Sequence, residues 1–365
     1  MEWIRVLIFI AGLGIVAEAL ISEIKAIVLP RSAPDLPTSI VFVNIRRVFN
    51  ILVNWAKTYS QKDAIMAYYA PITVLMMVPT WIFLVLTGYT AMFWSVGTGA
   101  WTFDAWFQAF RMSGSSLFTL GFEPLDSLLK TILGFSEAGI GLMLVALIIS
   151  YLPSTYAAFS RREMAVTLLE VRAGSPPSPF QMLQRYYRLH GLDALTEQWL
   201  FWETWFADVE ESHTSLPALV FFRSPQPEHS WVTAAGTIMD TAALTLSAID
   251  IPPDPQASLC IRAGFLALQR ISDFFNISYN PDPDPSDPIS IKRDEFDAVI
   301  KQLSDEGLPI KPDLEQAWKD YSGWRTNYDT VLLSLAALTM APIATWSSDR
   351  AGLTYVSPPI LRKMR

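Results

Sequence analysis

The sequence predicts an all-helical membrane protein whose second half is a soluble helical domain, and three observations predict it. The 365 residues are 51% hydrophobic and only 17% charged, below the charged fraction of about 25% that is typical of soluble proteins. Two long windows, residues 64–103 and 138–160, contain no Asp, Glu, Lys or Arg. Residues 1–160 carry equal numbers of acidic and basic side chains, so the whole net charge of −8 lies in residues 161–365.

The charge and cysteine content exclude several classes of protein. An acidic second half does not fit a nucleic-acid surface, which needs clustered Lys and Arg. The single cysteine, Cys260, excludes an intrachain disulfide and fits a reducing compartment. We therefore expect residues 161–365 to form a helical domain in the cytoplasm.

Three membrane-spanning helices are expected. Residues 71–96 and 129–152 are apolar over more than the about 20 residues that a helix needs to cross a bilayer core. A further span lies within residues 1–29, where the rival interpretation is a signal peptide cleaved near residues 17–19. Basic residues follow the first and last spans, and the positive-inside rule then places the N-terminus outside the cell membrane. These basic residues are Lys25, Arg31, Arg46, Arg47, Lys57, Arg161 and Arg162.

Residues 30–70 join the first span to the second and contain an amphipathic stretch at residues 38–57. Apolar side chains recur there at helical spacing, and Asn and Arg residues lie largely opposite them. The pattern is typical of a basic helix that lies on the inner leaflet of a membrane. A helix packed on the soluble domain would have the same pattern, so both interpretations stay open.

The segment between the two main spans carries the candidate chemistry. Residues 101–126 are too short to cross the bilayer twice and too aromatic for an exposed loop. Thr102 or Asp104 can cap a short helix that ends near Phe118. We expect a half-membrane helix followed by an extended return segment. Irregular backbone at membrane depth is stable only where it is buried in protein or lines a watery path.

The return segment reads Thr119, Leu120, Gly121 and Phe122. Gly121 admits backbone angles that are closed to other residues, so successive carbonyl oxygens can face one side and replace the water around a cation. With its flanking helices, this segment resembles the two-helix, pore-loop potassium channels, whose filter begins Thr-Val-Gly-Tyr/Phe. The resemblance covers residues 71–162. It implies a homotetramer in which four loops form one selectivity filter, without enzyme activity, cofactor or bound metal other than the permeant cation.

The sequence departs from this family pattern after Phe122. Glu123 replaces the second glycine of the filter, so sodium is a second candidate beside potassium for the permeant ion. We expect Glu123 to form a ring of carboxylates at the outer mouth that concentrates cations; the alternative is a solvated loop charge. The single glycine followed by an aromatic residue also resembles the bacterial potassium-uptake transporters, but those need four repeats in one chain.

Further residues are expected to support or gate the filter. Arg111 and Glu137 are ionisable groups at membrane depth, where such groups are usually paired, so we expect them to pair behind the filter, with Asp104 as a rival partner for Arg111. Gly139 and Gly141 can bend the last span or pack against a neighbouring helix. A hydrophobic narrowing near the inner end can close a pore. The candidate gate residues are Ile148, Tyr151 and Leu152.

The second half reads as helical. Residues 154–172 extend the last span and Gly174 ends it, and a strand is weakly indicated at residues 219–222. Ser230 and Ser290 suit the starts of two helices. The expected helices cover residues 180–190, 193–211, 231–249, 256–275, 290–305 and 313–338.

Ligand-binding signals in this half are weak. The chain has no GxGxxG or GKS/T motif for a nucleotide. Glu210, Glu211 and His213 could touch a metal ion, although a solvated helix end explains them better. Residues 281–288 could hold calcium, but their prolines favour a rigid exposed loop. The aromatic run at residues 199–206 is expected in the core or at a subunit interface.

The sequence thus predicts a tetrameric cation channel with a pore domain at residues 71–160 and a helical cytoplasmic regulatory or assembly domain at residues 161–365. Its expected partners are other copies of the chain and membrane lipid, and the regulatory ligand is unknown. The alternative function is a membrane-anchored sensor or scaffold in which the re-entrant loop is structural. A membrane-bound enzyme is weakly supported, because no pair of nucleophile and base stands out.

Overall fold

The computed structural model describes residues 2–27, 29, 35–97, 101–189 and 191–350. Helices dominate this part of the chain, which contains no strand; an isolated antiparallel bridge joins Ile249 to Ile310. The expectation of an all-helical protein is therefore confirmed for the described residues. Arg31, one of the basic residues that set the expected topology, lies outside them.

The chain divides into two compact units. Unit 1 combines Met1–Val48 with Ala70–Tyr156, and unit 2 combines Phe49–Tyr69 with Ala157–Arg365. Each unit is built from segments that are distant in the sequence, and each is described by itself below.

Four helical stretches of the described chain are long and apolar enough to span a membrane. Three of them correspond to the expected spans, and the fourth falls in the amphipathic stretch that was expected to lie along a membrane surface or on the soluble domain. The chain is therefore consistent with a membrane protein. The four stretches are Glu2–Ile27, Leu36–Val53, Tyr59–Val96 and Leu128–Ala173.

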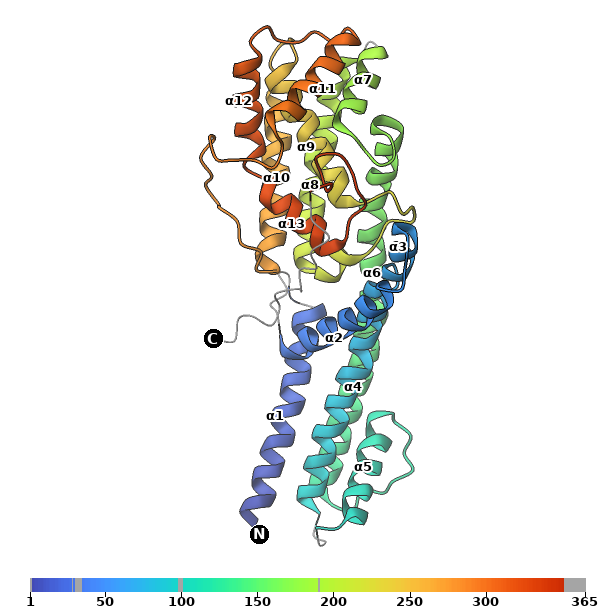
Figure 1. The fold of residues 1–365 in the computed structure, drawn as a ribbon. Coiled ribbons are helices and arrows are strands. Elements are labelled where there is room, and N and C mark those ends of the chain that lie inside the picture. The colour runs from blue at the N-terminus through green and yellow to red at the C-terminus, as the bar shows by residue number, and fades with distance from the viewer. Residues whose placement is uncertain (1, 28, 30–34, 98–100, 190, 351–365) are drawn as a thin grey trace. The chain divides into compact units, whose positions relative to one another are not determined.

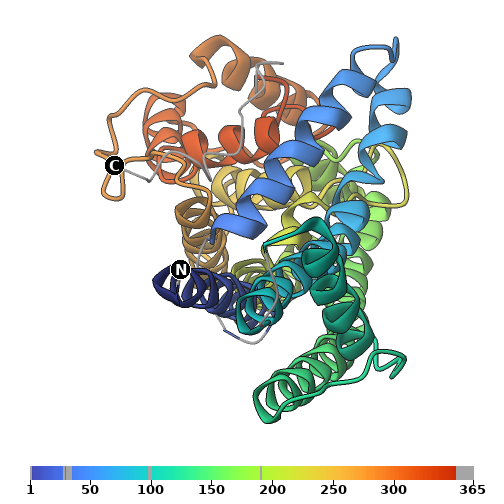
Figure 2. The same ribbon diagram turned by 90° about the horizontal axis from the view of Figure 1, so that it is seen from below.

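Unit 1 contains the helices that surround the candidate site. They are α1 (Glu2–Ile27), most of α2 (Leu36–Val53), α4 (Tyr69–Val96), α5 (Phe103–Leu117) and the first part of α6 (Leu128–Ala173). Figures 1 and 2 show α1 beside α4 and the short helix α5 close to α4 and α6.

Two glycines bring α1 and α4 into close contact. A Cβ atom added to Gly12 would lie 2.5 Å from the carbonyl oxygen of Gly88, and one added to Gly88 would lie 2.6 Å from a methyl group of Val16. Small residues allow helix backbones to approach closely in a membrane. Gly12 and Val16 both precede the possible cleavage site at residues 17–19, so the packing of α4 uses the segment that a signal peptidase would remove.

Unit 2 is a bundle of helices around a hydrophobic core. Figure 1 shows α8 (Leu195–Ser215), α9 (Trp231–Ala248) and α10 (Pro255–Phe274) side by side, and almost every residue of α9 is buried. Trp199 and Trp202 are buried in α8, which confirms that the aromatic run contributes to the core. The other helices are α3 (Tyr59–Met66), α7 (Pro179–Arg188), α11 (Arg293–Asp305), α12 (Leu314–Arg325) and α13 (Asp329–Thr339).

Three expectations for this unit are wrong in detail. Residues 313–338 form two helices, α12 and α13, which turn residues 326–328 separate, and a buried ion pair of 2.7 Å joins Arg325 at the end of α12 to Asp329 at the start of α13. Residues 217–221 form a 3₁₀ helix, η2 (Pro217–Phe221), and not a strand. Ser290 does not cap α11; its hydroxyl donates a hydrogen bond of 2.7 Å to Asp329.

Candidate functional site

Helix α5 begins as the sequence predicts. The hydroxyl of Thr102 accepts a hydrogen bond of 3.3 Å from the backbone N–H of Ala105, so Thr102 rather than Asp104 supplies the cap. One face of α5 is buried, and it carries Ala109, Met112, Ser113, Ser115 and Leu117. The helix has 15 residues and a length of about 22 Å at 1.5 Å per residue, which is shorter than a bilayer core of about 30 Å.

The C-terminal end of α5 rests directly on α6 at a glycine. A Cβ atom added to Gly141 would lie 2.3 Å from the carbonyl oxygen of Leu117, whereas one added to Gly139 would meet no atom within 4 Å. Gly141 therefore serves close packing between α5 and α6. Gly139 lies on an open face of α6 and is not needed for this contact.

The return segment after α5 turns tightly and is not simply extended. Thr119 has φ +55° and Gly121 has φ +72°, both in the left-handed region that glycine adopts most readily. The N–H of Leu120 donates a hydrogen bond of 2.8 Å to the carbonyl of Ser115, and the N–H of Thr119 donates one of 3.0 Å to Ser116. The end of α5 therefore supplies the acceptors for the first half of the turn.

Ser115 also holds the second half of the turn through its side chain. Its hydroxyl oxygen accepts hydrogen bonds from the backbone N–H groups of Phe122, at 3.1 Å, and Glu123, at 3.3 Å. Ser115 is buried, so these bonds are shielded from solvent. The backbone and side chain of this one residue together fix the amides on both sides of Gly121.

The carbonyl oxygens of the turn are left without such partners. Within the described chain, no hydrogen bond ends on the carbonyl oxygen of Thr119, Leu120, Gly121 or Phe122. The side chains of Leu120 and Phe122 are 62% and 53% exposed. The turn therefore lies on an exposed surface of unit 1 with unshared peptide oxygens, while the amides of Thr119, Leu120 and Phe122 are bound by the end of α5.

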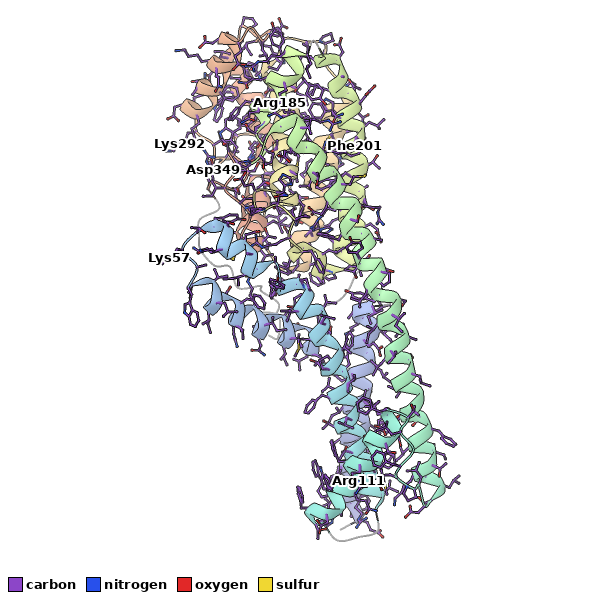
Figure 3. The ribbon with its side chains drawn as sticks, turned by 90° about the vertical axis from the view of Figure 1, so that its right-hand side faces the viewer. Lys57, Arg111, Arg185, Phe201, Lys292 and Asp349 are labelled. Atoms are coloured by element: carbon purple, nitrogen blue, oxygen red, sulfur yellow. The ribbon has the colours of Figure 1, made fainter. Side chains whose placement is uncertain are left out.

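Arg111 and Glu123 form an ion pair across the turn. A guanidinium nitrogen of Arg111 lies 2.5 Å from a carboxylate oxygen of Glu123, and the guanidinium carbon lies 5.6 Å from the centre of the Phe122 ring. Figure 3 labels Arg111 on α5. The Glu123 side chain is only 10% exposed, so its charge is balanced and largely covered within one chain.

The pairing expected between Arg111 and Glu137 is therefore wrong. Glu137 is buried and accepts a hydrogen bond of 2.5 Å from the hydroxyl of Ser113. Ser113 follows Arg111 by two positions, about 200° around the helix, so a side chain that meets Ser113 on the buried face of α5 cannot also meet Arg111. The second carboxylate oxygen of Glu137 is buried without a hydrogen-bond partner.

The candidate gate residues lie along the middle of α6. Ile148 and Tyr151 are partly buried and Leu152 is 42% exposed. Pro153 lies within the helix, and the backbone carbonyl of Tyr151 accepts a hydrogen bond of 3.0 Å from Thr155. The helix continues through the proline to Ala173, where Gly174 ends it with φ +85° as expected.

In unit 2, the buried side chain of Arg162 on α6 holds the η2 segment. Its guanidinium donates hydrogen bonds of 2.7 Å to the carbonyls of Leu219 and Phe222. It also lies 3.0 Å from Nε2 of His213 and forms an ion pair of 2.7 Å with Glu163. An arginine is always charged, so His213 must accept this hydrogen bond in its neutral form.

Arg223 lies two positions after the end of η2 and binds two other parts of unit 2. It pairs with the carboxylate of Asp63 on α3 and donates hydrogen bonds to the carbonyls of Thr339, at 2.7 Å, and Met340, at 3.1 Å. Phe221 packs edge-on against Tyr69, with ring centres 5.3 Å apart. The η2 loop therefore joins α6, α3 and the first residue of α4.

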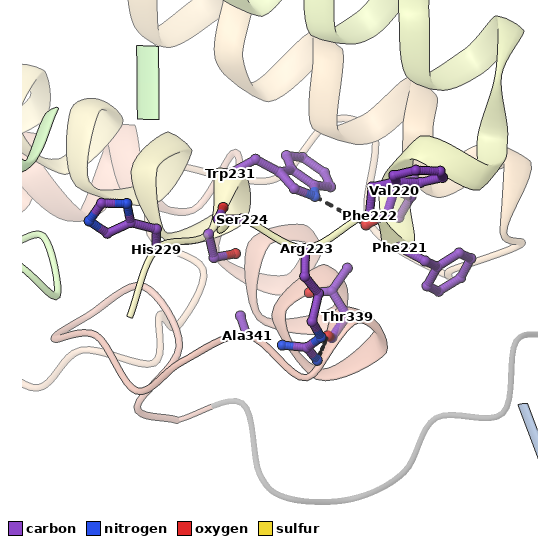
Figure 4. A pocket seen from close by; sticks show the side chains of 10 residues that line it. Val220, Phe221, Phe222, Arg223, Ser224, His229, Trp231, Thr339 and Ala341 are labelled. Atoms are coloured by element: carbon purple, nitrogen blue, oxygen red, sulfur yellow. Dashed lines mark hydrogen bonds between the residues drawn. The ribbon is translucent and has the colours of Figure 1, made fainter. Parts of the chain in front are cut away.

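A small cavity lies beside this loop. Figure 4 shows Arg223 directed toward Thr339, while the His229 ring points away from both. The cavity has a volume of about 20 Å³, enough for about one water molecule. It is too small for an organic ligand.

The weak metal signals do not gather into a site. Among the residues that the structure describes, no group of three or more His, Cys, Asp or Glu side chains could hold a metal ion. Glu210 pairs with Arg270, and burial, reinforced by the neighbouring Arg162, holds the pKa of His213 well below its usual value. Nε2 of His213 already accepts the hydrogen bond from Arg162.

Sequence reasoning identified the turn but missed two serines that position it. Ser113 and Ser115 lie in a run of small residues, residues 113–116, that by itself predicts no hydrogen-bond partner. The structure assigns them specific partners, Glu137 and the amides that follow Gly121. Their spacing of two residues is no signal by itself, since helix neighbours at that distance point in different directions.

Comparisons with models of known protein families, with curated proteins and with solved structures found no match.

Proposed function

We propose that this protein is a cation channel whose filter is formed by the turn at Thr119, Leu120, Gly121 and Phe122, with potassium as the first candidate ion. The observation that carries the proposal is the division of the peptide groups of this turn. The amides of Thr119, Leu120 and Phe122 are bound by the end of α5, whereas the carbonyl oxygens of the turn accept no hydrogen bond within the described chain. Unshared carbonyl oxygens at membrane depth can replace the water around a cation.

A pore requires several copies of the chain, because one turn supplies oxygens on one side only. We therefore propose a homotetramer, as the resemblance to pore-loop potassium channels implies. An exposed apolar stripe on α6 supports contact between copies, since its residues repeat at alternating spacings of four and three, as in packed helices. The stripe consists of Leu128, Ile132, Phe135, Gly139, Leu142, Ala146 and Ile149.

The ion pair of Glu123 changes the proposal for the outer mouth. Its carboxylate is balanced by Arg111 in the same chain, so the mouth has less negative potential than a ring of four free carboxylates would give. We infer that Arg111 and Glu123 position the turn rather than attract cations. Selectivity between potassium and sodium then depends on the carbonyl oxygens themselves.

Ion flux through lipid vesicles tests the proposal. Purified full-length protein in vesicles with a potassium gradient is expected to pass potassium, and reversal potentials in mixed solutions give the ratio of potassium to sodium permeability. Gly121→Ala is expected to reduce or abolish the flux, because a residue with a Cβ resists φ +72° by about 1 kcal/mol or more.

Gly14→Ala is the matched control. A Cβ atom at Gly14 or at Gly121 meets no atom within 4 Å, but Gly14 has no positive φ. Flux that is equal in both variants would contradict a filter at Gly121. Absence of flux in the parent protein at every tested voltage and pH, together with particles that have no central pore, would favour the membrane scaffold instead.

A further inference from the structure

A cavity of about 270 Å³ lies in unit 1 where the ends of four helices meet. It is bounded by the start of α1, the end of α4, the start of α5 and the start of α6 with the residues before it. Its volume approaches the range of about 300–1,000 Å³ that is usual for ligand sites. Its lining includes the polar and aromatic residues Arg5, Trp94, Trp101, Gln108, Asp126 and Lys130.

The lining carries more positive than negative charge. The guanidinium of Arg5 lies 5.3 Å from the centre of the Trp101 ring and donates a long hydrogen bond of 3.5 Å to the carbonyl of Ser95. Lys130 pairs with Asp126 at 2.8 Å, and the Lys130 side chain is 13% exposed while that of Asp126 is 68% exposed. Two cations and one carboxylate leave a net charge of +1, which matches a singly charged anion.

The helix ends that bound the cavity also carry exposed apolar side chains. Trp3 and Leu7 of α1 and Phe103 of α5 are between 65% and 83% exposed. Tryptophan is enriched at membrane–water interfaces, and Trp94 and Trp101 pack edge-on in the cavity wall with ring centres 4.6 Å apart. The ligand that fits has a compact anionic head and apolar chains that can follow these exposed side chains.

We propose that this cavity binds the phosphodiester head group of an anionic phospholipid, with Arg5 and Lys130 as the cationic partners of the phosphate. A phosphodiester carries one negative charge, and arginine and lysine are the usual side chains that bind phosphate oxygens. Gln108 and the indole N–H groups add neutral donors. The site does not depend on ion conduction, so the lipid-binding proposal and the channel proposal are tested independently.

Lipid-dependent thermal stability of the full-length protein tests the site. The protein in a neutral detergent is titrated with dioctanoyl phosphatidylglycerol, dioctanoyl phosphatidylcholine or inorganic phosphate, and the rise in melting temperature gives an apparent Kd. Phosphatidylglycerol is expected to bind most tightly, and its affinity is expected to fall as salt is added. Equal effects of the two lipids would overturn the charge argument, and equal effects of inorganic phosphate and phosphatidylglycerol would overturn the assignment to a lipid.

Three single substitutions locate the binding to this cavity. Arg5→Gln is expected to weaken phosphatidylglycerol binding about tenfold or more, because it removes a charge-assisted hydrogen bond. Asp126→Asn is expected to strengthen it severalfold, because the net charge rises and Lys130 loses its competing carboxylate; a damaged fold cannot produce this gain. Arg47→Gln, at an exposed cation of α2, is the control and is expected to leave the affinity unchanged. Unchanged affinity in both Arg5→Gln and Asp126→Asn would overturn the proposal.

Discussion

At the scale of single residues, His213 shows how a buried charge sets the state of its neighbours. Arg162 is fully buried. Its guanidinium donates hydrogen bonds to the carbonyls of Leu219 and Phe222 and to Nε2 of His213. Three of its partners can therefore only be acceptors. His213 is buried beside this guanidinium, and burial followed by the charge of Arg162 lowers its pKa well below the usual value.

This arrangement predicts a pH dependence of stability. In the unfolded chain His213 binds a proton near pH 6.5, whereas in the folded chain its lowered pKa keeps it neutral to lower pH. The contribution of neutral His213 to folding stability is therefore complete above about pH 6.5 and is lost as the pH falls below that value. The loss is at most about 1.4 kcal/mol per pH unit in that range. Thermal unfolding of the full-length protein between pH 7.5 and pH 5 measures it.

His213→Gln separates this effect from other titrating groups. The amide keeps a hydrogen-bond acceptor for Arg162 and does not titrate, so the variant is expected to be less stable at pH 7.5 and to lose less stability on acidification. Parallel pH profiles for the variant and the parent protein would contradict the role assigned to His213.

At the scale of the elements, the packing of α5 on α6 depends on the absence of a side chain at Gly141. The carbonyl of Leu117 occupies the space in which a Cβ of residue 141 would lie. This carbonyl belongs to the last residue of α5, directly before the turn that carries Gly121. Displacement of α5 at this contact would therefore move the candidate filter.

Two glycine substitutions test this packing, one in α6 and a control in α1. Gly141→Ala is expected to destabilise the protein by about 1–3 kcal/mol, as overpacking does in other cores. Gly14→Ala in α1 places the same methyl group in open space and is expected to leave the stability unchanged or slightly higher, because alanine favours helix. Thermal unfolding in detergent measures both, and equal stabilities of the two variants would show that α5 can shift away from α6 without cost.

At the scale of the whole molecule, the η2 loop gathers the parts of unit 2 that continue into the candidate pore helices. Arg162 attaches η2 to α6, and Arg223 attaches the residues after it to α3, which directly precedes α4. Both arginines are largely buried. The η2 loop therefore connects, within unit 2, the C-terminal part of α6 with the segment that directly precedes α4.

Removal of one partner from this loop gives a prediction with a matched control. Arg223→Gln leaves the carboxylate of Asp63 without its cation, and loss of one partner of a buried ion pair costs about 3–5 kcal/mol. Arg161→Gln breaks an ion pair with Asp208 in which the arginine is 54% exposed, and exposed pairs contribute about 0–1 kcal/mol. Thermal unfolding should therefore distinguish the two variants clearly, and similar losses would contradict the attachment of α3 by Arg223.

The sequence alone predicted the apolar helices, the short helix after Thr102, the Ser230 cap and the end of α6 at Gly174, and the structure confirms these features. Each depends on composition, helical periodicity or cap chemistry, which act over a few neighbouring residues. The sequence also predicted that Gly121 uses backbone angles closed to other residues, but it indicated an extended segment there and not the tight turn that the structure shows.

Only the tertiary structure decided which side chains meet. The partner of Arg111 is Glu123 and not Glu137, Ser115 rather than the turn itself fixes the amides on both sides of Gly121, and residues 326–328 interrupt a helix that looked continuous. These outcomes depend on the angular position of each residue on its helix and on segments distant in sequence. Local propensity carries no information about such contacts, because the free energy of a buried charge or a close helix crossing is set by the partner that arrives from elsewhere in the chain.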